Sequence, residues 1–487
     1  MAANPIVANQ DGPLPKVSIS DDEGAPLVEK SEEDVANAQF TTFAAWHALK
    51  GVGGGCFVSS FPLYVSRLAG ENPVRAAIFA LLAALCDAAG DAIGGAIVTP
   101  FADRPDVGRR PLLILGAFAI SASLAFLAIF SRSLVALLLG SFLCSFFFAS
   151  LTVVVCVDCV ARGATAGQSV WCYVGIPGAK DDQAPTPLFG EPLFISRVVG
   201  VYVAQLACYG VGFVIGSGIG MALALNVSLA SCAATGSGLY ALAGVVGIAV
   251  LPETLDAFSG LEPLGLASQS PSALCAVLWG GKADVERRSY VASYLFNAAA
   301  ISCTPPLMVY FLLWRFDLNH IIYFELVASV AAALIVGFLS YWFYLRERFG
   351  GCRCMFWGLG VLAIGFAGVG VAFELKMLFA ALPLCVLTSP TLLQYLFIHG
   401  VVAPEKQGRL AAAIQIASGI CVASGLALGY GLWLGLKTDD EHGSRGTRRD
   451  FAGASSFFAT AGLFLLAAYA ILPACALERE RRATGMD

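Results

Sequence analysis

Four ionisable side chains stand inside otherwise apolar stretches of this 487-residue chain, where a charge is costly and therefore indicates a function. His47 and Lys50 are three residues apart and Asp87 and Asp91 are four apart, so each pair shares one helix face. At about 1.5 Å per residue from the expected helix ends, Lys50 lies about 13 Å deep and Asp91 about 15 Å deep, with Asp87 at about 21 Å. This common level predicts a buried Lys50–Asp91 ion pair. It leaves Asp87 as the acid that exchanges a proton, with His47 as its relay.

The alternative is that the same four side chains form a static polar cluster whose only role is to orient two helices. Replacing Asp87 by Asn separates the two interpretations, because a static cluster tolerates a neutral amide of the same size.

The elements that must position these residues follow from composition. Asp, Glu, Lys and Arg make up 13% of the chain, against about 25% in ordinary soluble domains. Apolar residues with Gly are about two-thirds of the chain, above the roughly 45–50% of globular proteins. A soluble protein of this size could not bury so much apolar surface away from water. A soluble enzyme, a disordered chain and a small disulfide scaffold are excluded, and an all-α polytopic membrane protein is predicted.

Charge-free windows of at least about 20 residues mark the expected membrane spans. They are 111–131, 133–157, 198–252, 289–314, 326–345, 354–373, 377–404, 410–436 and 451–477. The window 198–252 is long enough for two helices and divides near Asn226–Gly238. With two charge-interrupted stretches, 41–66 and 76–101, the total is twelve spans.

The twelve spans predict two six-helix halves joined by polar segments. The expected parts are an acidic, disordered tail at 1–40, a first half at 41–251 with a polar insertion at 162–196, a solvated linker at 252–288, a second half at 289–477, and a tail at 478–487. An even number of spans puts both termini on one face. That face collects 19 of the 29 Lys and Arg residues, so we expect both termini to be cytoplasmic, in a membrane that the sequence leaves open. The sequon at Asn226 lies on the outer face in a short loop, where glycosylation is not expected.

An acid, an Arg, a turn, a Gly and a further basic residue follow the second span of each half. The first copy comprises Asp103, Arg104, Gly108, Arg109 and Arg110, and the second comprises Glu347, Arg348, Gly350 and Arg353. Arg104 and Arg348 are about half the chain apart, as in a duplicated sequence, and duplicated halves are typical of transporters. At these residues the chain resembles the major facilitator superfamily, and the resemblance implies that the loops hold one conformation closed.

Three further segments carry the resemblance. Arg197 with Gly212, Gly216 and Gly220 is similar to the helix 5 motif of antiporters, Leu251-Pro-Glu-Thr254 closes the sixth span as in many members, and Val402–Leu410 resembles tetracycline/proton antiporters and hippocampus-abundant-transcript transporters. The resemblance implies that the glycines form a pliable seam between conformations. The plain interpretation is close helix packing, since small residues let backbones approach.

Polar side chains on other spans complete the candidate site: Gln205, Asn297, Gln394 and Gln415. Each lies on a helix that lines the cavity in the family, although such residues more often bond neighbouring helices. The leading interpretation is a secondary transporter of a small organic solute, working by alternating access as a proton antiporter. The alternatives are a facilitative uniporter and a non-transporting receptor or scaffold. We expect a monomer in the bilayer with no enzymatic activity, cofactor, metal or nucleic-acid partner, because neither a P-loop nor zinc-like Cys spacing occurs.

Overall fold

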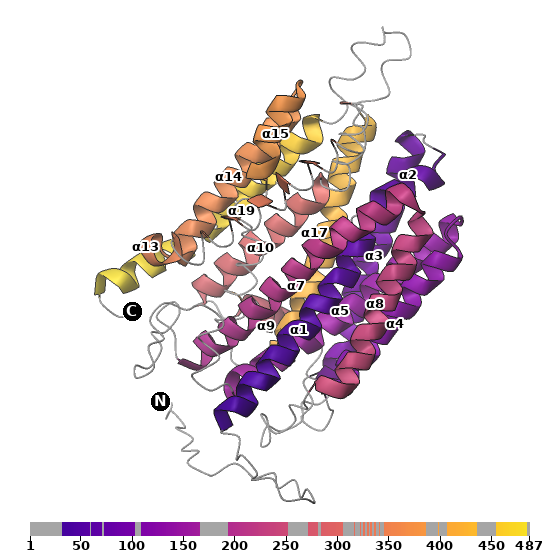
Figure 1. Ribbon diagram of the computed structural model, residues 1–487. Coiled ribbons are helices and arrows are strands. Elements are labelled where there is room, and N and C mark those ends of the chain that lie inside the picture. The colour runs from indigo at the N-terminus through magenta and orange to yellow at the C-terminus, as the bar shows by residue number, and fades with distance from the viewer. Residues whose placement is uncertain are drawn as a thin grey trace, which may run out of the picture.

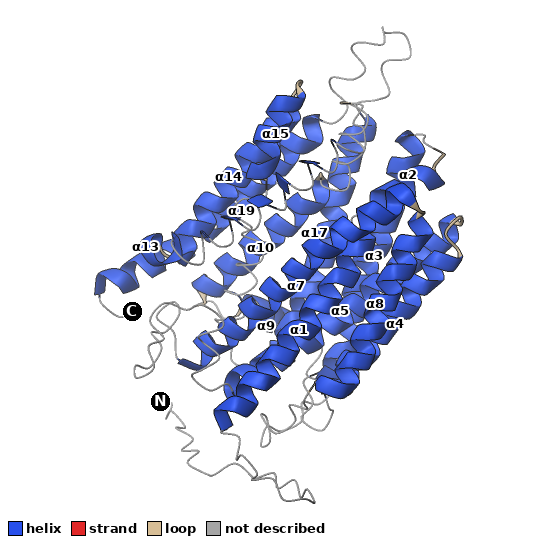
Figure 2. Ribbon diagram, in the orientation of Figure 1, coloured by secondary structure: helices blue, strands red, loops and turns tan. Residues whose placement is uncertain are grey.

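The computed structural model describes most of the predicted spans. It describes residues 32–58, 60–70, 73–102, 109–165, 193–251, 271–280, 284–304, 345–385, 407–435 and 454–484, with scattered single residues between 316 and 340 and at 398. Within these ranges the chain is helix and turn without a strand (Figure 2). The all-α prediction is therefore confirmed.

The helices of the first half follow the predicted spans closely. They are α1 (Glu32–Val58), α2 (Phe61–Leu68), α3 (Pro73–Ala102), α4 (Arg109–Ile129), α5 (Leu134–Thr165), α7 (Leu193–Asn226) and α8 (Leu229–Val250). The second half contains α10 (Val285–Cys303), α13 (Arg346–Phe349), α14 (Gly351–Val371), α15 (Leu375–Leu384), α17 (Gln407–Gly435) and α19 (Ala454–Thr484).

The first predicted span, 41–66, is two helices rather than one. The Ser60 hydroxyl donates to the carbonyl oxygens of Cys56 and Phe57, at 3.3 and 2.9 Å, and so bonds carbonyls at the end of α1. Pro62 has no N–H and is tolerated only in the first turn of α2. The other end of α1 also differs from the prediction, because the helix begins at Glu32, inside the segment 1–40 expected to be disordered.

The long apolar window 198–252 divides at the predicted place. α7 ends at Asn226, and the Ser228 hydroxyl accepts a hydrogen bond from the Ser231 N–H at 3.1 Å, which caps α8. The linker 252–288 differs from a purely solvated segment, because it contains the short helix α9 (Pro271–Trp279). α9 packs against α17, with Val277 and Leu278 buried.

Seven described helices contain an apolar stretch long enough to cross a bilayer: α3, α4, α5, α8, α14, α17 and α19. Large apolar side chains are exposed on their outer faces, as lipid-facing surfaces require. The chain is an integral, multi-pass membrane protein.

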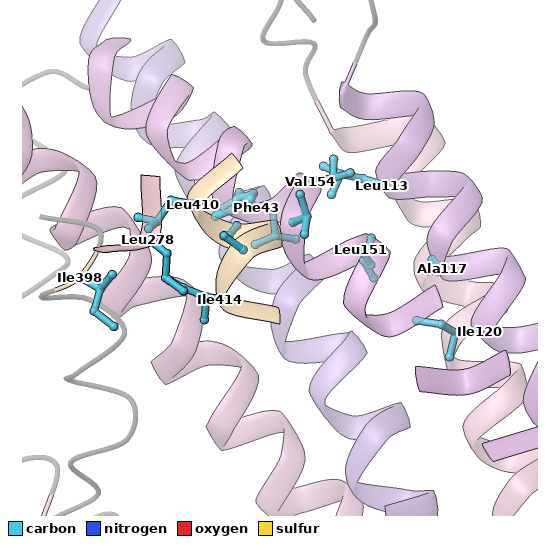
Figure 3. Close-up of a cluster of buried hydrophobic side chains, with 14 of the residues drawn as sticks. Phe43, Leu113, Ala117, Ile120, Leu151, Val154, Leu278, Ile398, Leu410 and Ile414 are labelled. Atoms are coloured by element: carbon cyan, nitrogen blue, oxygen red, sulfur yellow. The ribbon is translucent and has the colours of Figure 1, made fainter. Parts of the chain in front are cut away.

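The two halves form two groups of helices that meet along α3 and α17 (Figure 1). In the first group α1 packs against α7 and α8, α3 against α5, and α4 against α8. In the second, α10 packs against α17 and α19, and α14 against α19. A buried apolar cluster joins the groups, with Phe43, Leu113 and Val154 from the first half and Leu410 and Ile414 from the second (Figure 3).

Candidate functional site

His47 and Lys50 are buried side chains of α1, and His47 lies among aromatic rings and beside one amide of α7. The His47 ring packs edge-on against the rings of Phe43 and Trp46, with centroids 4.4 and 4.9 Å away. Its Nδ1 lies 3.2 Å from the Gln205 amide nitrogen on α7. An amide nitrogen only donates, so Nδ1 accepts this bond. The buried Lys50 ammonium lies 4.3 Å from the centre of the Trp46 ring, a favourable cation–π position.

Asp87 lies at the contact between α3 and α5. The Ser145 hydroxyl of α5 donates to Asp87 Oδ1 at 3.0 Å. The other titratable groups beside this carboxyl are Asp91 and Cys86 on α3 and Cys144 on α5. Among the described residues, these neighbours of Asp87 are one carboxyl and two thiols.

The predicted Lys50–Asp91 ion pair is not formed between these two described residues. The prediction assumed that the first two spans are neighbours because they are consecutive. Instead α1 packs mainly against α7 and α8, and α3 against α5 and α17. The four charged residues therefore lie in two groups, His47 with Lys50 on α1 and Asp87 with Asp91 on α3, rather than in one cluster.

Asp91 lies where the two halves of the protein meet. Ala88 and Gly95 on α3 face α17, whereas Asp87 and Gly94 face α5. At 3.6 residues per turn, Asp91 projects between these two faces. Asp91 is therefore positioned beside the seam between the two halves, where α3 contacts α17.

The seam beside Asp91 is closely packed. A Cβ built on Gly95 would lie 3.0 Å from Cβ of Gln415, and one on Gly419 would lie 3.0 Å from the Ala88 carbonyl oxygen. Gln415 is thus at the contact between the halves, opposite Gly95, which is one helical turn from Asp91 on α3. The structure places this predicted cavity residue in the interface.

The other predicted cavity residues have different surroundings. Gln205 is buried against His47, and Asn297 is fully buried on α10. Gln394 lies outside the described residues.

Replacing Gln205 by Leu is expected to lower the stability of the folded protein by about 1–3 kcal/mol, because it removes a buried donor to an imidazole nitrogen. The apparent melting temperature of the purified, unglycosylated protein measures the effect. Asn226→Leu is the matched control on the same helix, since the Asn226 amide is exposed and bonds the Ala222 carbonyl of its own helix. Equal shifts for the two variants would show that the Gln205–His47 contact contributes nothing special.

The helix 5 glycines make backbone contacts between α7 and α1. A Cβ on Gly212, Gly216 or Gly220 would overlap the carbonyl oxygens of Ala48, Val52 and Cys56, respectively. The contact is reciprocal, because Gly51 and Gly55 of α1 meet the carbonyl oxygens of Tyr209 and Phe213. This arrangement supports the packing interpretation of the motif. The side chain of Arg197 lies outside the described residues.

The second half repeats this contact. A Cβ on Gly425 or Gly429 of α17 would overlap the carbonyl oxygens of Ala299 and Cys303 on α10. α10 and α17 correspond to the seventh and eleventh predicted spans, as α1 and α7 correspond to the first and fifth. This repeated glycine contact between two helices agrees with the duplication inferred from the two loop motifs.

The loop motifs are described in part. Asp103, Arg104 and Gly108 lie outside the described residues, as does the side chain of Glu347. Arg109 is buried, and Arg110 donates to the Ile248 carbonyl oxygen of α8.

In the second loop the Arg348 guanidinium lies 5.6 Å from the centre of the Phe349 ring, and Arg353 is exposed. Gly350 has φ of 87°, which favours glycine at the turn into α14.

Two groups of polar side chains near these site residues were not predicted from the sequence: Ser145, and the pair Tyr209 and Tyr240. Ser145 is a single hydroxyl within an aromatic run of α5, and its position opposite Asp87 depends on helix pairing. The hydroxyls of Tyr209 and Tyr240 lie close together beside Gly54 of α1, where they share a hydrogen bond. Both groups could have been found in the sequence by searching the charge-free spans for polar side chains.

The arrangement of helices described above is shared with proteins of known structure. No protein-family profile matches the sequence, and no curated protein sequence matches it. Solved structures do match over nearly the whole chain, at low sequence identity. The human organic anion transporter MFSD10 (TETRAN) is 15% identical with a TM-score of 0.62, covering 90% of this chain and 99% of that one.

Two other matches are a point mutant of the nucleoside transporter NupG and FucP, a major facilitator superfamily transporter in the outward conformation. The NupG mutant is 13% identical with a TM-score of 0.60, and the match covers 90% of this chain and 99% of NupG. FucP is 12% identical with a TM-score of 0.54, and the match covers 89% of this chain and 97% of FucP. The chain therefore has the fold of the major facilitator superfamily transporters.

Proposed function

We propose that this protein is a secondary active transporter that moves a small organic solute across a membrane by alternating access and exchanges it for protons. The observation that carries the proposal is the pair of carboxyls on α3. Asp87 faces the Ser145 hydroxyl of its own half, and Asp91 lies one turn away beside the contact with α17 of the other half. A proton bound at this pair changes the charge next to the surface on which the halves move.

The coupling step follows from the cost of a charge in an apolar environment. With both carboxyls ionised, two negative charges one turn apart repel each other, and one of them lies beside an apolar seam. Protonation removes a charge and eases closer packing of α3 on α17. Deprotonation favours an arrangement that opens the seam to water. The two states thus differ in proton affinity, which is the requirement for coupling.

The buried His47–Lys50 group supplies positive charge on the same half of the protein. His47 contacts Gln205 and aromatic rings, so we assign coupling to the carboxyl pair alone. Both termini lie on the cytoplasmic side in this proposal, as the distribution of Lys and Arg indicates. Lys50 provides a fixed cation that favours anionic solutes. The fold shared with an organic anion transporter supports including organic anions first among candidate solutes.

A thermal-shift panel at two pH values tests the solute, and proteoliposomes test the transport. Organic anions, nucleosides and sugars form the panel, and each stabilising compound is then assayed for counterflow and for accumulation driven by a pH gradient. We expect counterflow and uphill accumulation with the same compound. Counterflow without any response to the gradient would support the uniporter alternative. Failure of every stabilising compound in counterflow would support the receptor or scaffold alternative.

A further inference from the structure

Two arginines lie at the ends of the lipid-facing surfaces of two adjacent helices. On α14, Trp357, Ile364 and Val371 are exposed by 69, 66 and 50%. They repeat every seven residues, and Arg353 continues the stripe one turn before Trp357. On α19, Leu465, Tyr469 and Leu472 are exposed by 58, 73 and 40%, and Arg479 continues that stripe. α14 and α19 pack against each other along their length.

The two arginines meet at a small cavity. Phe349, Arg353, Glu478 and Arg479 line it, and its volume is about 70 Å³. The cavity is at the end of the helices where the membrane interface is expected, with the exposed Trp357 ring just below it in the position typical of an interfacial anchor. Its size suits one compact polar group.

The charge of the cavity is set by the arginines. Both oxygens of the Glu478 carboxylate accept backbone N–H bonds at the start of α14, from Gly351 and Cys352, at 3.0 Å each. That carboxylate is thereby held against the positive end of the α14 dipole. Arg353 and Arg479 have no hydrogen-bond or ion-pair partner in the described part of the chain. The cavity is therefore lined by two guanidinium groups and one carboxylate whose oxygens already accept backbone bonds, which leaves an excess of positive charge.

We propose that this cavity binds the phosphate group of an anionic phospholipid, whose acyl chains lie along the exposed stripes of α14 and α19. Guanidinium groups bind phosphate oxygens through paired N–H donors. Apolar stripes that lead directly to the cavity distinguish a lipid from a free phosphate ion, which would gain nothing from them. The proposal is independent of the transported solute.

Lipid retention by the purified full-length protein tests the site. The protein is titrated with phosphatidylglycerol, with phosphatidylcholine and with inorganic phosphate alone, and bound lipid is measured by native mass spectrometry. We expect wild-type protein to retain phosphatidylglycerol in preference to phosphatidylcholine. The double variant R353Q/R479Q is expected to bind phosphatidylglycerol about tenfold more weakly or worse, as for two basic residues near an anionic headgroup.

The double variant R67Q/R132Q removes the same charge from the first half of the protein, at the opposite membrane face. It is expected to bind phosphatidylglycerol like wild type. The variant R353K/R479K keeps the charge, so partial recovery in it shows that the loss reflects the arginines rather than misfolding. Equal retention by R353Q/R479Q and wild type would overturn the proposal. So would equal losses in both double Gln variants, or displacement of the lipid by inorganic phosphate at matched concentration.

Discussion

Replacing Asp87 by Asn is expected to abolish accumulation driven by a pH gradient while leaving counterflow intact. Asn has nearly the size of Asp, and its side-chain oxygen can still accept the hydrogen bond from Ser145. The variant should therefore fold and still bind solute, but it cannot exchange a proton at this position. Accumulation ratios in proteoliposomes, with and without the gradient, measure the effect, and we expect the gradient-dependent part to vanish.

Two variants accompany this measurement. Asp284→Asn makes the same chemical change in a partly exposed ion pair with Arg287, remote from α3 in the chain, and should leave coupling intact. Ser145→Ala keeps the Asp87 carboxyl but removes its hydrogen-bond donor, so it should weaken coupling without abolishing it. If Asp87→Asn still concentrates solute up a gradient, Asp87 is not the coupling acid, and Asp91→Asn becomes the decisive variant.

Replacing Gly216 by Ala is expected to destabilise the protein by about 1–3 kcal/mol or more, the range measured for overpacked cores. The added Cβ would overlap the Val52 carbonyl oxygen of α1. A backbone atom in a helix cannot rotate away as a side chain does, so α1 and α7 must separate along their whole contact. The apparent melting temperature and the monodisperse fraction after purification measure the loss.

Gly218→Ala and Gly210→Ala are the matched controls. Both positions lie on α7, and a Cβ at either would meet nothing within 4 Å. Alanine also favours helix over glycine by about 1 kcal/mol, so the controls should be neutral or slightly stabilising. In the second half the same contrast is available between Gly429, which meets the Cys303 carbonyl, and Gly431, which meets nothing. Equal effects at Gly216 and Gly218 would contradict a backbone contact.

Much of the architecture was predictable because apolar length is a local property. The window 198–252 was predicted to divide near Asn226–Gly238, and α7 ends at the start of that stretch, at Asn226. The all-α membrane fold agrees with the described helices. The spacing of Gly212, Gly216 and Gly220 predicted a face suited to close packing, and that face packs on α1. Local exceptions were missed where side-chain bonding decides, as at Ser60, whose hydroxyl helps to divide the first span into α1 and α2.

The candidate site was predictable in its members but not in its partners. Asp87, Asp91, Lys50 and His47 are identifiable because a charge inside an apolar stretch is costly wherever it lies. Which of them meet depends on which helices are neighbours, and depth along a helix carries no information about this. Equal depth suggested a Lys50–Asp91 pair, whereas α7 supplies Gln205 to His47 and α5 supplies Ser145 to Asp87.

The 13% charged fraction and the pattern of apolar windows by themselves determined that the chain is a multi-pass helical membrane protein with costly charges on its first two spans. The tertiary structure alone decided that these charges separate into two groups and that Asp91 lies beside the seam with α17. It also decided that Arg353 and Arg479, far apart in the chain, share one cavity. Hydropathy indicates which segments lie in the membrane. Which helices become neighbours depends instead on how small residues pack between them.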